Sequence, residues 1–346
     1  MKSRGREPKR IKTVLGDIAF HRSLFVCPVC GPGRFPGDEV LDVVRTGFSP
    51  GVRRLMARAG QRDTFKEGRD DLQEFAGIRV TAKDVERVSE GTGKEIEIWQ
   101  SQERSLILKE KQNPEVSDKI PVLYVSYDGT GVPMVPWETA GRKGMQADGS
   151  CRTREVKLGC VFTQTTVDPQ GRPVRDDAST SFVGAIESSE EFGWRIYGEA
   201  VRRGLEFARK VVVIADGARY NWEIASFHFP GAIEIVDLYH AREHLHDLCV
   251  LLVPGSSREL IRLETRWRTM FDEGKVEKII KEAQRRLPRD KERHEAAQKE
   301  IGYFMNNASR MRYGQYHSQC LFVGSGVVEA GCKTVIGKRL KQSGMQ

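Results

Sequence analysis

The sequence lacks any hydrophobic run approaching the ~20 residues that span a membrane. Its basic N-terminus is not followed by the apolar core of a signal peptide. Seven cysteines occur among 346 residues, an odd and mostly isolated set that suits a reducing cytosol better than a disulfide framework. No internal repeat is visible. With 39% hydrophobic and 30% charged residues, the chain is expected to be a globular, cytoplasmic protein of two or three domains.

Positive charge is in excess and unevenly placed. The formal net charge is +8 and the pI is about 9.1. Residues 1–12 hold six Lys/Arg against one Glu, and residues 255–315 hold fifteen Lys/Arg against ten acids. Clustered positive charge is typical of proteins that bind phosphate backbones. Solvated basic helix faces give the same composition, so charge alone leaves both interpretations open.

The first 37 residues predict a basic arm and a small β element. An apolar segment over residues 18–26 leads into Cys27-Pro-Val-Cys30-Gly, the spacing of half a tetrahedral zinc site. The chain has no second pair of this kind. Cys27 and Cys30 are therefore candidate zinc ligands at an incomplete, zinc-ribbon-like site, and a free dithiol is the alternative.

Residues 38–118 predict a helical region followed by a linker. A helical pattern over residues 65–76 stops at Gly77, and Thr81 to Asp84 forms a capping box that opens a second helix. This outline favours a helix-turn-helix whose second helix would enter a major groove, although ordinary helix pairs share it. The polar stretch over residues 109–119 predicts the linker.

Residues 119–346 predict an α/β domain. Short apolar segments favour strands at residues 122–128, 155–163, 180–186, 211–216 and 232–237, and an amphipathic pattern predicts a helix over residues 190–210. Three strands, a helix and two further strands is the order of the ribonuclease H-like fold, a mixed sheet whose first and fourth strands are neighbours. An all-helical insertion is expected at residues 241–320, and a last helix at residues 327–335.

Two acids stand at the ends of apolar strands. Asp128 and Asp216 are each followed by glycine, and the carboxyl ends of such strands face the crevice where open α/β sheets bind ligands. Neighbouring carboxylates hold divalent metal, although Asp-Gly is also a common turn. Asp-Gly-Thr at 128–130 also occurs in haloacid-dehalogenase-like phosphatases. The nucleophile of those enzymes would fall at Ser126, which argues against that interpretation.

Several motifs together resemble one family. They are Tyr127-Asp-Gly-Thr-Gly-Val-Pro133, Arg154-Glu-Val-Lys-Leu-Gly159, Ala215-Asp-Gly-Ala218, Asp237-Leu-Tyr-His-Ala-Arg-Glu-His-Leu245, Gly326-Val-Val-Glu-Ala-Gly-Cys-Lys-Thr334 and Arg339-Leu-Lys-Gln-Ser-Gly-Met345. In order and spacing the chain resembles the bacterial insertion-sequence DDE transposases of the ISKra group, which are related to the Mutator-like transposases.

The resemblance implies site residues, cofactor and partners. Asp128, Asp216 and Glu329 would be the catalytic acids, holding Mg²⁺ or Mn²⁺ for two-metal cleavage and strand transfer of DNA. His240 would contact the scissile phosphate or the metal's surroundings, and Lys333 and Lys338 would contact phosphates. Element ends and target DNA would be the partners of a homodimer or larger assembly near the bacterial nucleoid.

Other residues near these motifs have alternative roles. Asp237, Glu243, His244 and His246 could hold zinc, but their place at the start of one helix favours a surface that faces DNA or solvent. Trp267 is expected in the core rather than stacked on a flipped base.

The chain also departs from the family pattern. Family members usually extend beyond the Ser-Gly-Met segment and carry a further Cys-x-x-Cys upstream of Cys27. A truncated, catalytically defective transposase that acts only as a DNA-binding or regulatory protein is therefore the alternative.

Overall fold

The computed structural model divides the chain into two compact units. One comprises Met1–Gln102 together with Gly337–Gln346, and the other comprises Glu103–Ile336. The structure describes the whole chain except residues 111–118, 145–148, 150, 254, 256 and 342–346. Most of the predicted linker and the Ser343-Gly-Met345 ending therefore lie outside the described residues.

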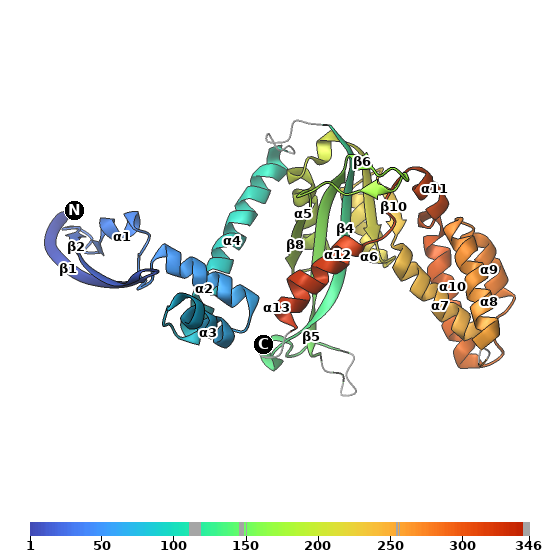
Figure 1. Cartoon of the computed structure of the whole chain (residues 1–346), viewed down its shortest axis with the longest axis horizontal. Helices are drawn as coiled ribbons and strands as arrows, with labels where there is room; N and C mark the ends of the chain where they lie inside the picture. The colour runs from blue at the N-terminus through green and yellow to red at the C-terminus, as the bar shows by residue number, and fades with distance from the viewer. Residues whose placement is uncertain (111–118, 145–148, 150, 254, 256, 342–346) are drawn as a thin grey trace. The chain divides into compact units, whose positions relative to one another are not determined.

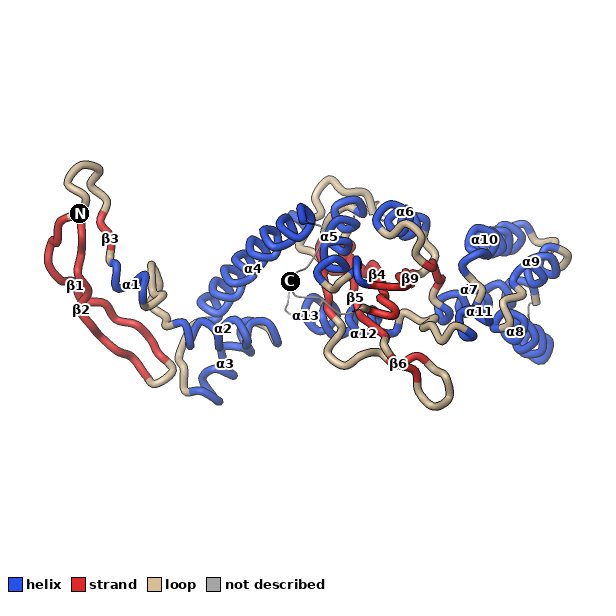
Figure 2. Tube along the Cα trace, turned by 90° about the horizontal axis from the view of Figure 1, so that it is seen from above, coloured by secondary structure: helices blue, strands red, loops and turns tan. Residues whose placement is uncertain are grey.

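The first unit begins with a long two-stranded ribbon (Figures 1 and 2). β1 (Lys2–Thr13) pairs antiparallel with β2 (Gly16–Val26), and the short β3 (Gly33–Arg34) pairs with the end of β2. The strand predicted over residues 18–26 is confirmed. The preceding residues, expected as a basic arm, form a full partner strand, because their backbone groups find hydrogen-bonding partners along β2.

Helices complete this unit: α1 (Pro36–Val40), α2 (Pro50–Arg62), α3 (Phe65–Ala76), α4 (Ala82–Glu110) as far as Gln102, and the short α13 (Lys338–Leu340). α3 ends at Gly77 in the left-handed conformation (φ 63°), as predicted. The Thr81 hydroxyl accepts from the Asp84 N–H at 3.1 Å, which confirms the predicted cap. A small core holds these helices together, made by Val52, Met56, Leu72, Ile78 and Val85.

The second unit is built on a five-stranded mixed sheet with the order β10-β9-β4-β5-β8. Its strands are β4 (Ile120–Pro133), β5 (Thr153–Gln164), β8 (Ser181–Ala185), β9 (Ala208–Ala215) and β10 (Ile233–Val236). β4 pairs antiparallel with β5 and parallel with β9. The first and fourth predicted strands are therefore neighbours, as expected.

Two predicted boundaries are wrong. β4 does not end at Asp128 but continues to Pro133, because its antiparallel pairing with β5 continues to Pro133 opposite Thr153. The helix predicted over residues 190–210 ends at Arg202, since Gly204 adopts a left-handed conformation (φ 88°) that breaks it. A 3₁₀ turn, Leu205–Phe207, then leads into β9. A small sheet of β6 (Thr166–Val167) and β7 (Pro173–Val174) was not predicted.

Helices cover both faces of the sheet. Gly159 lies within contact distance of Ile196 and Phe192 on α5 (Ser189–Arg202), whereas Leu158, on the opposite face, approaches Gly331 at the end of α12 (Gly326–Gly331). α6 (Arg219–His228) follows β9 and packs against α5. A π-helical segment, Cys332–Gly337, continues α12.

The predicted helical insertion is also present (Figure 1). Its helices are α7 (Leu238–Leu252), α8 (Ser257–Asp272), α9 (Val276–Gln284), α10 (Lys291–Asn307) and α11 (Tyr313–Ser318). Trp267 is fully buried among them and donates its indole N–H to Glu282 at 2.9 Å, so its predicted core position is confirmed. In the part of the chain that the structure describes, no helix combines the length and apolar character that crossing a membrane requires.

Candidate active site

Asp128 and Asp216 lie at one edge of the sheet, here called the acidic edge. The parallel pairing of β4 with β9 ends at Ser126 opposite Ile214. Asp128 lies two residues further along β4, and Asp216, the residue after β9, lies two residues beyond Ile214. Adjacent strands are about 4.8 Å apart, so the register places the two residues side by side.

The acidic edge leaves the charge of Asp128 without a basic partner. Its Oδ1 accepts from the Gly129 N–H at 2.7 Å, and its Oδ2 accepts from the Cys332 thiol at 3.7 Å. Among the described residues, no Lys or Arg forms an ion pair with Asp128 or Asp216. Burial raises the pKa of Asp128, and the negative charge of Asp216 raises it further. The hydrogen bond from Gly129 and the nearby His240 lower the pKa of Asp128.

The turn after β9 holds Asp216 in place. Its Oδ1 accepts from the Ala218 N–H at 2.9 Å and from the Asn221 side chain at 2.6 Å. Gly217 adopts φ 95°, and a Cβ there would meet the Tyr303 ring at 2.8 Å, so this position requires glycine.

Helix α10 of the insertion braces the same turn. The Tyr303 hydroxyl donates to the backbone carbonyl of Asp216 at 2.9 Å. The Asn307 amide donates to the carbonyl of Gly217 at 3.2 Å and accepts from the Trp222 indole at 2.9 Å. The insertion therefore has a direct structural connection to the acidic edge.

Asp237 connects three further parts of the site. It is buried and caps α7, its Oδ1 accepting from the His240 N–H at 2.7 Å. Its Oδ2 accepts from the backbone N–H of Ser325, the residue before α12. The Ser325 hydroxyl in turn donates to Oε1 of Glu329 at 3.0 Å. A single carboxylate thus positions the start of the helix with His240 and the start of the helix with Glu329.

Glu329 is carried on a helix that reaches the acidic edge. Cys332, one helical turn after Glu329, is the residue whose thiol contacts Asp128. The carboxylate of Glu329 itself is half-buried and hydrogen-bonded to Ser325. Within the described residues, no group of three or more His, Cys, Asp or Glu side chains lies close enough to hold a metal ion.

The imidazole rings of His240 and His244 contact each other on α7. Their rings meet edge to face, with centroids 5.1 Å apart. His244 also stacks on Tyr303 at 3.8 Å, and its Nδ1 lies 2.6 Å from Glu300 Oε2. His246 is not part of this contact, and its Nδ1 lies 3.1 Å from Glu264 Oε2. The histidines therefore do not gather around one point, and the half-exposed His240 is the one that lowers the pKa of Asp128.

The remaining predicted site residues lie elsewhere. Cys27 and Cys30 are close enough for the Cys30 backbone and side chain to lower the pKa of the Cys27 thiol by hydrogen bonding. Lys333 and Lys338 are both exposed, but Lys338 belongs to the first compact unit.

The sequence did not single out Tyr303, Tyr220, Ser325 or Cys332 as site residues. Glu300, Tyr303 and Asn307 recur at helical spacing on α10, a signal that marks one helix face but not what it contacts. Burial raises the pKa of Tyr220, and the negative charges of Asp216, Glu155 and Asp128 raise it further.

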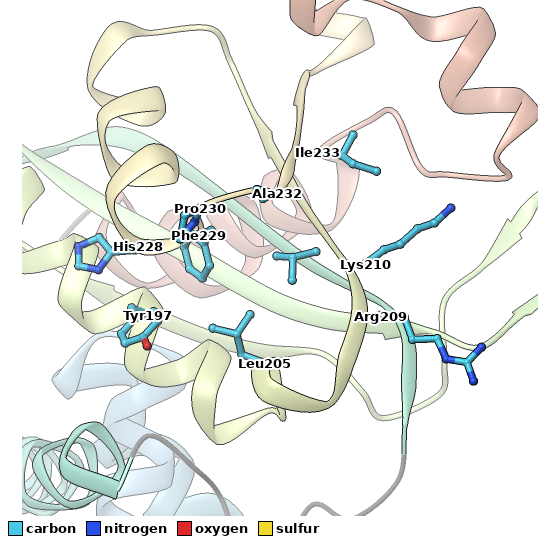
Figure 3. Close-up of a pocket in the computed structure, with 11 residues that line it drawn as sticks. Tyr197, Leu205, Arg209, Lys210, His228, Phe229, Pro230, Ala232 and Ile233 are labelled. Atoms are coloured by element: carbon cyan, nitrogen blue, oxygen red, sulfur yellow. The ribbon is translucent and has the colours of Figure 1, made fainter.

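A separate cavity of about 520 Å³ lies at the other end of β9 (Figure 3). Tyr197, His228 and Phe229 form its aromatic wall, and Arg209 and Lys210 stand at the start of β9. Because Asp216 follows the last residue of the same strand, this cavity is remote from the acidic edge.

No protein-family model matches the chain, and no curated protein matches it. Among solved structures, it is similar to a chain of the Drosophila P element transposase strand transfer complex, with 10% sequence identity and a TM-score of 0.29. The similarity covers 74% of this chain and 64% of that chain, so it extends over less than two thirds of the other protein. The functional interpretation therefore rests on the site itself.

Proposed function

We propose that the protein is a DDE-type DNA transposase with a ribonuclease H-like core, similar to the ISKra group. The observation that carries this proposal is the acidic edge. Asp128 on β4 and Asp216 directly after the parallel strand β9 stand side by side without a described basic partner, and the helix of Glu329 docks against Asp128. Two neighbouring carboxylates without a basic partner repel each other and destabilise the fold unless a cation binds between them. Such a pair is typical of a metal site rather than of a structural turn.

The donor set fits Mg²⁺ or Mn²⁺. Both aspartates offer hard carboxylate oxygens, and Asp216 is held by hydrogen bonds to one oxygen only, Oδ1. Asp128 and Asp216 would hold the ions, and Glu329, which is bonded to Ser325 and not grouped with them in this structure, would join them on metal binding. When bound, the ions would supply an activated water or DNA 3′-hydroxyl and stabilise the leaving oxygen of an in-line displacement.

The chain's own residues would orient the DNA phosphate around these acids. The turn at Asp216 keeps its carboxylate directed to the edge through Tyr303 and Asn221. Asp237 fixes the first turn of α7, so that the half-exposed His240 lies near Asp128 as a contact for the scissile phosphate. Lys333, exposed and next to Cys332, would contact a flanking phosphate.

Nicking of supercoiled plasmid by the purified chain tests the proposal. The plasmid would carry the DNA that flanks the gene, and the reaction would contain Mg²⁺ or Mn²⁺. We expect metal-dependent nicking that is lost in Asp128→Ala, Asp216→Ala and Glu329→Ala, and retained in the control Asp177→Ala, an exposed acid of the loop before β8.

Two outcomes would count against this function. DNA binding without nicking under every metal condition would favour the defective, regulatory form of the protein. Nicking that survives all three acid substitutions would show that the acidic edge is not the active site.

A further inference from the structure

The β1–β2 ribbon has two different faces. Side chains alternate between the faces of a strand, so pairing assigns each residue to one side. One face, here called the outer face, carries Arg6, Pro8, Arg10 and Lys12 with their cross-strand partners Ser23, His21, Ala19 and Asp17. Lys9 and Ile11 project from the opposite, inner face.

The inner face is anchored to the rest of the unit. Ile11 is buried, and the Lys9 ammonium donates to Asp38 Oδ2 at 2.9 Å. Arg22 donates to the same carboxylate, and its guanidinium lies 3.7 Å from the centre of the Phe35 ring. The backbone N–H of Lys12 donates to the carbonyl of Gly47 at 2.8 Å. These contacts fix the orientation of the ribbon and leave its outer face to solvent.

Arg6 and Arg10 on the outer face are not neutralised. Both are exposed, and no described residue forms an ion pair with either one. By contrast, Lys9 is paired with the buried Asp38, and Lys12 is paired with Asp17 at 2.8 Å. The single acid of β1, Glu7, pairs across from Arg22 and therefore belongs to the inner face. The outer face therefore carries one carboxylate, Asp17, which is paired with Lys12, and it presents the guanidinium groups of Arg6 and Arg10 unpaired.

The dimensions of this face match a duplex. Arg6 and Arg10 are separated by four residues of extended strand, or about 13 Å. The major groove of B-DNA is about 12 Å wide and admits a two-stranded β-ribbon. Where the ribbon crosses the groove, this spacing brings the two guanidiniums to phosphates on its two sides.

We propose that the β1–β2 ribbon docks across a groove of double-stranded DNA through its outer face, with Arg6 and Arg10 contacting phosphates. This inference rests on the proposed function only in taking DNA as the ligand. It assigns DNA contact to the ribbon, in addition to the helical region that the sequence favours for that role.

Fluorescence anisotropy with a labelled duplex of arbitrary sequence tests the proposal, using the full chain at several salt concentrations. Each phosphate contact contributes about 0.9 to the slope of log affinity against log salt, so Arg6→Ala/Arg10→Ala should make the slope shallower by about 2. Arg209→Ala/Lys210→Ala removes the same charge at the far end of β9 and should leave the slope unchanged. Arg6→Lys/Arg10→Lys retains the charge and should restore it.

Several outcomes would overturn the proposal. One is an unchanged slope in the Arg6→Ala/Arg10→Ala variant, and another is an equal decrease in the Arg209→Ala/Lys210→Ala control. A third is a loss of affinity for single-stranded DNA, in the Arg6→Ala/Arg10→Ala variant, equal to its loss for a duplex of the same length. This result would show that the ribbon contacts a single backbone rather than a groove.

The failure of this inference differs from failure of the proposed function. Metal-dependent nicking with a salt slope independent of Arg6 and Arg10 would refute only the ribbon. A slope that depends on these arginines, in a chain that never nicks DNA, would refute only the transposase activity.

Discussion

Asp128 is a residue whose charge opposes folding. Burial and the neighbouring Asp216 raise its pKa, so the folded chain binds a proton at Asp128 more tightly than the unfolded chain does. The ionised carboxylate therefore destabilises the metal-free fold at neutral pH. This contribution to unfolding disappears as the pH falls through the raised pKa of Asp128, because the side chain then becomes neutral.

Asp128→Asn should accordingly raise the melting temperature of the metal-free chain at neutral pH while abolishing DNA nicking. The difference from wild type should shrink as the pH is lowered toward the pKa of the folded Asp128. Thermal melts across this pH range, with the exposed Asp177→Asn as a control, would check the prediction. A variant less stable than wild type at neutral pH would contradict it.

The carboxylate of Asp237, unlike that of Asp128, stabilises the fold. It is buried, and both of its oxygens accept backbone hydrogen bonds. Asp237→Ala should lower the free energy of unfolding by about 2 kcal/mol, since it removes a helix cap and leaves a second buried N–H unsatisfied. Asp290→Ala is the matched control, because Asp290 caps α10 from an exposed position through one bond of 2.9 Å. Urea unfolding should show the larger loss for Asp237.

At the level of elements, α10 connects the helical insertion to the acidic edge. Tyr303→Phe removes the hydroxyl that donates to the Asp216 carbonyl but keeps the ring stacked on His244. We expect about 1 kcal/mol of lost stability and, because the Asp216 turn loosens, a several-fold lower nicking rate. Tyr316→Phe removes a similar hydroxyl that donates to the Glu234 carbonyl at 3.3 Å. It should lower stability alone, and equal nicking rates in the two variants would disprove the connection.

The packing of α2 against α4 depends on a glycine. A Cβ at Gly60 would lie 2.3 Å from the Ser89 hydroxyl and 3.0 Å from Val85. Gly60→Ala should therefore destabilise the first unit by about 1–3 kcal/mol. Gly91→Ala, on α4 with no atom within 4 Å of the added Cβ, should instead stabilise it by about 0.4–1 kcal/mol. Melting of the two variants should shift in opposite directions.

The elements that the sequence predicted correctly are those with strong local signals. Apolar runs such as that before Asp216 predicted buried strands, and Thr81 with Asp84 predicted the start of a helix. The boundary of α5 was missed because its apolar pattern continues past Gly204 into β9. β1 was missed because its charged residues conceal the alternation, which becomes visible only when β2 pairs with it.

The candidate site shows the same limit. The strand order made Asp128 and Asp216 neighbours, but no local pattern indicates that Tyr303 would brace Asp216 across 87 residues. Likewise, the contact of Cys332 with Asp128 depends on how α12 docks on the sheet. Long-range contacts of this kind depend on packing, which a single sequence does not display.

For the whole molecule, metal should behave as a stabilising ligand. If Mn²⁺ binds the folded chain and not the unfolded one, a concentration 100-fold above its Kd should add about 2.7 kcal/mol to the free energy of unfolding. Calorimetry should show this rise in wild type and in Asp177→Ala but not in Asp128→Ala/Asp216→Ala. A rise in the double variant would place the metal elsewhere in the protein.

The chain passes between its two compact units twice, at residues 102–103 and 336–337. α13, which packs against α2, is synthesised after the entire sheet-containing unit. The Arg339 guanidinium donates to the Asp63 carbonyl at 3.4 Å, a contact that spans 276 residues of sequence. Because domains form as the chain emerges from the ribosome, the first unit to be translated is the last to be completed. A chain interrupted before residue 337 would therefore hold the acids of the sheet while its N-terminal unit lacked a packing partner.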